Sequence, residues 1–358
     1  MNANRPFHDE PRATIVRRRL LTIPRSLLLF TLLTLLAPVV AILAAVVDVT
    51  RLVFRRRPAM ALRLLAFAWV FLAAEAVGLV WFFASWVRSG FGRNQERLVA
   101  SAWPVQRWWG RTLFSAVCRL FSLHLVVEGD DPTPGPIVAM FRHVSIVDNL
   151  LPLVLLQDRH RLEMRWVIKR ELLSLPALDV GGTRLPNHFV ARGSGDPRTE
   201  LRAIRRLASD LGTNEGVMIY PEGTRFTERR RTRALDQLRQ RSPELYERAE
   251  RLRHVLPPRV GGALTLLDMG YDVVVCAHVG LDGFAKIRNL WSGSLVGRTV
   301  RTRFWRISAA DVPRSRPERV DWLFTHWEKV DAWIAGVDDA LRYTVREQPT
   351  PGSLDTSG

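Results

Sequence analysis

The chain has 358 residues, of which 47% are hydrophobic and 24% are charged, so it is long and apolar enough to fold around a sizeable core. Lys and Arg together number 52 against 35 Asp and Glu, and the formal net charge of +17 favours polyanionic partners. The two cysteines, Cys118 and Cys276, lie far apart in apolar surroundings, which argues against a disulfide framework or a cysteine metal site. Charge alone does not choose between anionic lipid, a phosphorylated substrate and nucleic acid.

Two apolar segments follow a basic N-terminal stretch at residues 1–25. Residues 27–47 carry no charged side chain and residues 64–87 carry one, Glu75. Each segment is about as long as the roughly 20 residues that cross a hydrocarbon core. A signal peptide fits poorly, since a second apolar segment follows without a clear cleavage site between them. We therefore expect a helical hairpin in the membrane over residues 26–99.

The topology of this hairpin is open on the sequence alone. Arginines cluster before the first segment, between the two segments and after the second. Two full spans would place one cluster on the outer side of the membrane, against the positive-inside tendency. A hairpin that enters one leaflet and returns would bring every cluster to anionic head groups on one face. In either case we expect the rest of the chain on the cytoplasmic side.

Beyond residue 100 the pattern changes to alternating strands and helices. After an amphipathic helix at 100–120, short β-rich runs occur at 123–128, 136–141, 165–168, 217–220 and 273–279. Helical patterns occur at 199–211, at 228–254 as an Arg- and Glu-rich insertion, and at 319–342. This alternation predicts an α/β domain over 100–346, with a mixed central sheet flanked by helices. We expect residues 347–358 to be disordered.

The most informative stretch is 140–152, MFRHVSIVDNLLP. A predicted strand ends, His143 follows, and a helix is expected from Ser145 with Asp148 in its first turn. A carboxylate there can hold the imidazole in one tautomer, so that the other ring nitrogen acts as a general base for a hydroxyl. The same residues also fit a helix-capping pattern, in which Asp148 only caps the helix and His143 is a polar loop residue.

A second stretch, IYPEGTRF at 219–226, also follows a strand. Gly223 permits an unusual backbone angle, and Arg225 can grip a phosphate with its planar fork. Two weaker elements lie between the stretches: KREL with Lys169, and FVAR with Arg192. Basic residues at the ends of several strands would converge on one sheet edge, which suits a phosphate. Taken singly, each has an ordinary structural explanation.

In this order the motifs resemble the glycerolipid acyltransferase family that includes lysophosphatidic acid acyltransferases. Its Asn-His-x4-Asp motif stands here as Arg142-His143-x4-Asp148, with Arg in place of the usual Asn. Its Phe-Pro-Glu-Gly-Thr-Arg motif matches residues 220–225, its second motif matches 189–192 with Ala191 in place of a frequent acid, and its Pro-rich motif resembles 255–259. The resemblance covers roughly 120–285.

The resemblance implies that His143 and Asp148 are catalytic and that Glu222, Gly223, Thr224 and Arg225 shape the acceptor phosphate site. Arg192 and Lys169 would assist. It implies acyl transfer from acyl-CoA or acyl carrier protein to the hydroxyl of lysophosphatidic acid, forming phosphatidic acid.

No cofactor, metal or nucleic acid is expected, and anionic membrane lipids are expected partners. Two alternatives remain: another lysophospholipid or glycolipid acceptor, and a non-catalytic protein that binds anionic lipid. The chain lacks the Gly-x-Ser-x-Gly, P-loop and His-Glu-x-x-His motifs of other enzyme classes.

Overall fold

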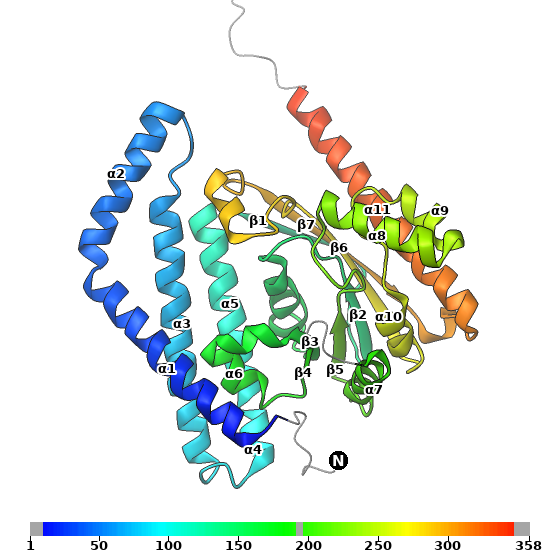
Figure 1. The fold of residues 1–358 in the computed structure, drawn as a ribbon, viewed down its shortest axis with the longest axis horizontal. Coiled ribbons are helices and arrows are strands. Elements are labelled where there is room, and N and C mark those ends of the chain that lie inside the picture. The colour runs from blue at the N-terminus through cyan, green and yellow to red at the C-terminus, as the bar shows by residue number, and fades with distance from the viewer. Residues whose placement is uncertain (1–9, 191–195, 347–358) are drawn as a thin grey trace, which may run out of the picture.

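The computed structural model describes residues 10–190 and 196–346. Its centre is a seven-stranded sheet with the order β1-β7-β6-β2-β5-β3-β4 (Figure 1). The strands are β1 (His124–Gly129), β2 (Ile137–Phe141), β3 (Glu163–Lys169), β4 (His188–Val190), β5 (Glu215–Ile219), β6 (Asp272–Val279) and β7 (Thr299–Ile307). The strands from β6 to β4 are parallel, whereas β7 runs antiparallel to β6 and parallel to β1. The mixed α/β fold expected from the sequence is thus confirmed.

Helices cover both faces of this sheet. They are α1 (Arg12–Leu35), α2 (Ala37–Arg55), α3 (Ala61–Arg88), α4 (Gln95–Ala100), α5 (Ala102–Phe121), α6 (Pro176–Gly182), α7 (Pro197–Ala208), α8 (Glu228–Arg241), α9 (Pro243–Arg251), α10 (Val260–Leu267) and α11 (Arg316–Arg346). Shorter helical turns are η1 (Asp148–Leu150), η2 (Leu153–Asp158), η3 (Arg170–Ser174), η4 (Ile287–Ser292) and η5 (Ala309–Asp311).

Side-chain alternation along the central strand β2 divides the core into two layers. Ile137, Ala139 and Phe141 pack with α5 and η2, while Val138 and Met140 face α7, α10 and α11 on the other side. Every residue of β2 is buried, as expected for a strand that is paired on both edges and covered on both faces. Polar side chains lie at the carboxyl ends of the parallel strands, between these two layers.

Three of the expectations for secondary structure need correction. The apolar stretch 27–47 is not one helix, because the chain breaks at Leu36 between α1 and α2, just before Pro38. The helix expected from Ser145 is instead a 3₁₀ turn that begins at Asp148. The strand β7 was not anticipated, because its sequence TVRTRFWRI carries an arginine at every second or third position.

The helices α1, α2 and α3 lie along one side of the sheet domain (Figure 1). α2 and α3 are long and apolar enough to cross a membrane, and only 17% of the apolar window of each is buried inside the protein. Both ends of this helical layer contact the domain. Arg18 donates to Asp179 at 2.8 Å, and Arg51 beside the α2–α3 turn donates to the Trp291 carbonyl oxygen at 2.8 Å.

A fully buried carboxylate joins the same layer to the domain in its middle. Glu75 of α3 accepts the indole N–H of Trp109 at 3.1 Å and the backbone N–H of Ala177 at 2.9 Å. Ala177 is in the first turn of α6, so Glu75 satisfies a helix N-terminal donor that has no partner within its own helix.

Candidate active site

Four of the parallel strands deliver the residues of interest to one edge of the sheet. β2 leads to His143, β5 to Glu222 and Gly223, and β3 ends at Lys169. β4 ends at Val190, and the Arg192 predicted to assist phosphate binding lies outside the described residues. The sheet order places Lys169 two strands away from the strand that carries His143.

His143 and Asp148 form a buried pair at this edge. The imidazole Nδ1 lies 3.0 Å from the Asp148 Oδ1. An ionised carboxylate only accepts hydrogen bonds, so Nδ1 carries the proton and Nε2 keeps its lone pair. No described residue is hydrogen-bonded to Nε2. The pair therefore has the geometry of a base oriented by an acid.

The second carboxylate oxygen of Asp148 caps the turn in front of it. Oδ2 accepts the backbone N–H of Val144 at 2.6 Å and of Ser145 at 2.7 Å, and the Ser145 hydroxyl accepts the Val147 N–H at 3.0 Å. Burial alone would raise the pKa of Asp148, but the charge and hydrogen bond of His143 and the backbone donors bring it below its ordinary value. Capping and pairing are thus two functions of one side chain, one for each oxygen.

An aromatic ring covers the imidazole. Tyr220 stacks on His143 with ring centroids 4.1 Å apart and an angle of 20° between the planes. The carbonyl oxygen of His143 accepts the N–H of Phe226 at 2.7 Å, so the segment after β5 holds the histidine from both its side chain and its main chain.

Glu222 is buried between two segments of backbone. Its carboxylate accepts the N–H of His143 at 2.8 Å and the N–H of Leu256 at 2.9 Å. Burial raises the pKa of Glu222 to about 8, although these two donors and the nearby Arg142 oppose the rise. The contacts identify Glu222 as a residue that fixes the histidine loop against residues 255–259.

The glycine that follows adopts a left-handed backbone conformation. Gly223 has φ of +66°, and a Cβ there would come within 2.8 Å of the Arg259 side chain. Thr224 and Arg225 are half-buried behind it, and Arg259 is exposed. The backbone N–H of Arg259 donates to the Pro221 carbonyl oxygen at 2.8 Å, which ties the two motifs together. Gly223 is thus favoured by its backbone angle, and the exposed Arg259 side chain would have to move to admit a Cβ there.

Residues 124–278 match the model of the acyltransferase family. This range contains His143 and Asp148, here called the dyad, together with Tyr220, Glu222 and Gly223. Over these residues the chain is similar to the acyltransferase domain. The crystal structure of the 1-acyl-sn-glycerophosphate (LPA) acyltransferase PlsC from Thermotoga maritima is similar at 16% sequence identity, with a TM-score of 0.47 over 78% of this chain and 97% of that one.

Several residues that surround His143 and Asp148 have no role that the sequence alone predicts. Tyr220 and Arg259 lie within two of the family motifs, beside Pro221 and Pro258. This position is the sequence signal that could have identified them as part of the site. Arg142 was noted only as a departure from the family motif. Its partners His278 and Asp282 carried no signal, because they come from a distant strand and the loop after it.

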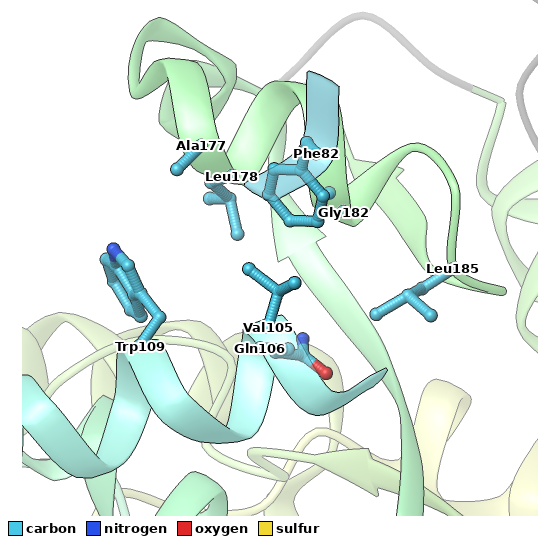
Figure 2. Close-up of a pocket in the computed structure, with 9 residues that line it drawn as sticks. Phe82, Val105, Gln106, Trp109, Ala177, Leu178, Gly182 and Leu185 are labelled. Carbon is cyan, nitrogen blue, oxygen red and sulfur yellow. The ribbon is translucent and has the colours of Figure 1, made fainter. Parts of the chain in front are cut away.

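Two cavities lie away from the dyad. A small apolar cavity of about 30 Å³ between α3, α5 and α6 is lined by residues that include Phe82, Val105, Trp109, Ala177 and Leu185 (Figure 2). A more open cleft of about 440 Å³ beside β4 and α7 is lined by residues that include Arg170, His188, Arg202 and Arg206. Over residues 10–190 and 196–346, no group of three or more His, Cys, Asp or Glu side chains is placed to hold a metal ion.

Proposed function

We propose that this acyltransferase domain moves a fatty acyl group from acyl-CoA or acyl carrier protein to the free hydroxyl of lysophosphatidic acid, which yields phosphatidic acid. One observation carries the proposal. Within the acyltransferase domain, Asp148 engages Nδ1 of His143 and leaves Nε2 as the nitrogen that can accept a proton. A hydroxyl brought to Nε2 becomes the nucleophile, so no side-chain nucleophile is required.

The reaction proceeds by direct attack. Nε2 of His143 takes the hydroxyl proton while the acceptor oxygen bonds to the thioester carbonyl carbon. The tetrahedral intermediate then expels the thiolate, which receives the proton from the imidazolium, so the histidine returns to its starting state. Asp148 stabilises the imidazolium between these two steps through its 3.0 Å contact with Nδ1.

The phosphate of the acceptor is assigned to the basic edge of the sheet. Arg225, Thr224 and Gly223 follow β5, immediately beyond the residue that stacks on His143. Lys169 is at the end of β3, and Arg259 packs against Gly223, which adds a second guanidinium near this turn. Arg192 is proposed as a further donor from the sequence alone. Guanidinium groups suit a phosphate because they donate two parallel hydrogen bonds.

The membrane arrangement proposed for α1, α2 and α3 is insertion into one leaflet, with the catalytic domain on the cytoplasmic side. Arg18 in α1 and Arg51 near the end of α2 both contact the same domain. A helix that crossed the bilayer would carry one of these ends to the opposite surface. α1 and α2 instead present a row of exposed apolar side chains, including Leu28, Val39 and Phe54, that suits lipid.

The test is an acyl-transfer assay with purified protein in phospholipid vesicles, with labelled acyl-CoA and acyl carrier protein supplied separately. Lysophosphatidic acid, other lysophospholipids, glycerol 3-phosphate and a glycolipid would be the acceptors. Activity confined to another acceptor would show that the proposed acceptor is wrong, while the proposed acyl-transfer mechanism would still hold.

Removal of the base separates catalysis from binding. We expect His143→Ala to lower kcat at least about a hundredfold, since general-base catalysis contributes about 10²- to 10⁴-fold. Asp148→Asn should lower kcat strongly as well, because an amide can present its N–H to Nδ1 and favour the wrong tautomer. Turnover by His143→Ala equal to that of the wild type would refute the mechanism, and binding of anionic vesicles without any transfer would favour the non-catalytic alternative.

A further inference from the structure

A buried arginine precedes the catalytic histidine. Arg142 is 1% exposed, and its guanidinium makes four hydrogen bonds. It donates to the carbonyl oxygens of His278 at 2.6 Å and His254 at 2.7 Å, and to both carboxylate oxygens of Asp282 at 2.6 and 3.3 Å. One side chain therefore joins the end of β2 to β6, to the loop after β6 and to the segment after α9.

The main chain of Arg142 is held as firmly as its side chain. Its N–H donates to the Cys276 carbonyl oxygen at 3.0 Å, which extends the β2–β6 pairing, and its own carbonyl oxygen lies 3.0 Å from Nε2 of His278. A carbonyl oxygen only accepts, so Nε2 of His278 carries the proton. The same nitrogen is 3.7 Å from Oδ2 of Asp148, so this N–H also lies close to the catalytic carboxylate.

The arginine also supplies positive charge to a site that is rich in buried acid. Burial lowers the pKa of Arg142, but the charges of Asp282 and, to a smaller extent, of Asp148, which is 1% exposed, raise it overall. His143, His278 and Tyr220 also face this cluster, and Arg298 acts on Asp282. Burial lowers the pKa of His278, so that it stays neutral. Buried carboxylates without a cation are costly.

We infer that Arg142 is a positioning residue of the acyl-transfer reaction. Its side chain clamps the loop that carries His143 and Asp148, and its charge balances the buried carboxylate of Asp148. This inference rests on the proposed function of the dyad. The Arg142 side chain is buried, and its hydrogen bonds go to His278, His254 and Asp282, not to Nε2 of His143. It acts through the backbone that places His143 and through the electrostatic field at Asp148.

The test separates position from charge with three variants. Arg142→Met removes both, Arg142→Lys keeps the charge but cannot reproduce a four-bond fork, and Arg142→Met combined with Asp282→Asn removes the carboxylate that the first change leaves unpaired. We expect each to lower kcat about 10- to 100-fold while the acceptor KM stays within about twofold, since displacement of a catalytic group by about 1 Å has such an effect.

The pH profile of kcat reports on the charge. Loss of the cation favours the protonated imidazole, so the acid limb should move to higher pH by about one unit in Arg142→Met. The shift should be smaller in the double variant, because the negative charge of Asp282 is removed as well. Arg142→Lys should leave the limb in its wild-type position. This difference is not expected from a loss of packing alone, and Arg142→Lys keeps the inference testable if the methionine variants do not fold.

A matched control is Arg165→Met. Arg165 is 3% exposed and, like Arg142, donates to backbone carbonyl oxygens and to carboxylates. Its partners are Leu207, Ser209, Asp210 and Glu215. It lies toward the amino ends of the parallel strands, whereas His143 lies at their carboxyl ends. Arg165→Met should lower the thermal midpoint without moving the acid limb.

The inference would be overturned by wild-type kcat in the double variant or by a wild-type acid limb in a folded Arg142→Met protein, provided that His143→Ala remains inactive. Absence of transfer by the wild-type protein would overturn the proposed function as well.

Discussion

Glu222 offers the most direct test of how the histidine loop is held. The change is Glu222→Gln, which keeps the size of the side chain and one acceptor oxygen but removes its titration. In the wild type, the two oxygens accept the N–H groups of His143 and Leu256. In the variant, the amide nitrogen must face one of these donors, with a pH-independent loss of about 1–3 kcal/mol.

The pH-dependent part of the difference in unfolding free energy favours the variant as the pH rises. Burial raises the pKa of Glu222 from 4.5 to about 8 in the folded protein. The folded state therefore holds the proton more tightly than the unfolded chain, and the stability that this provides is complete below pH 4.5 and is lost as the pH rises through 8. Linkage gives a loss of about 3 to 4 kcal/mol between pH 5 and pH 8. Glu222→Gln lacks this loss.

The assay is denaturant unfolding in detergent, followed by tryptophan fluorescence at several pH values for both proteins. Taking the difference between variant and wild type cancels the groups that titrate equally in both. We expect this difference to change by about 3 to 4 kcal/mol in favour of the variant from pH 5 to pH 8. Parallel stability curves would refute the view that Glu222 holds its proton near neutral pH.

Three further changes probe the site and the helical layer. Tyr220→Ala removes the ring that lies 4.1 Å from the imidazole and should lower kcat about tenfold, whereas Tyr220→Phe keeps the stacking and should stay within about twofold in steady-state assays. Gly223→Ala places a methyl group 2.8 Å from Arg259 at φ of +66° and should destabilise the protein by about 1–2 kcal/mol in thermal unfolding. Arg51→Ala loses a hydrogen bond and a ring contact with Trp291 and should speed amide exchange over residues 48–62 about tenfold.

Each of these expectations has a contrary result. Equal kcat for Tyr220→Ala and Tyr220→Phe would show that stacking does not position the imidazole. Wild-type stability of Gly223→Ala would mean that the turn relaxes without strain. Unchanged exchange in Arg51→Ala, with faster exchange after a change at Arg18, would place the attachment of the helical layer at the α1 end alone.

The sequence predicted the features that local order controls. The strand before His143, the strand before Tyr220 and the ordered motifs between them are encoded within short windows, and the mixed sheet follows from their alternation. Glu222 was assigned to substrate because its motif is adjacent to Arg225. Its contacts join His143, 79 residues earlier, and Leu256, 34 residues later, and no local pattern predicts such contacts.

The missed features share a dependence on tertiary context. A strand is stabilised by its neighbours on both edges, so β7 tolerates its arginines once β1 and β6 flank it, and Arg301 pairs with Glu128. The clamp at Arg142 joins residues up to 140 positions apart. The sequence shows Arg142 in a motif position, but it does not show that Asp282 compensates the charge of Arg142.

The buried carboxylate of Glu75 has a practical consequence for dissecting this enzyme. Through Glu75, which contacts Trp109 and Ala177, α3 completes the hydrogen bonding of α6. It also contributes Phe82 to a buried cluster that includes Trp103 and Val180. A chain shortened to begin after residue 88 would expose this apolar surface and leave an α6 donor unsatisfied. The helical layer and the sheet domain are therefore one folding unit, and a variant made to test the proposed membrane attachment must keep α3 in place.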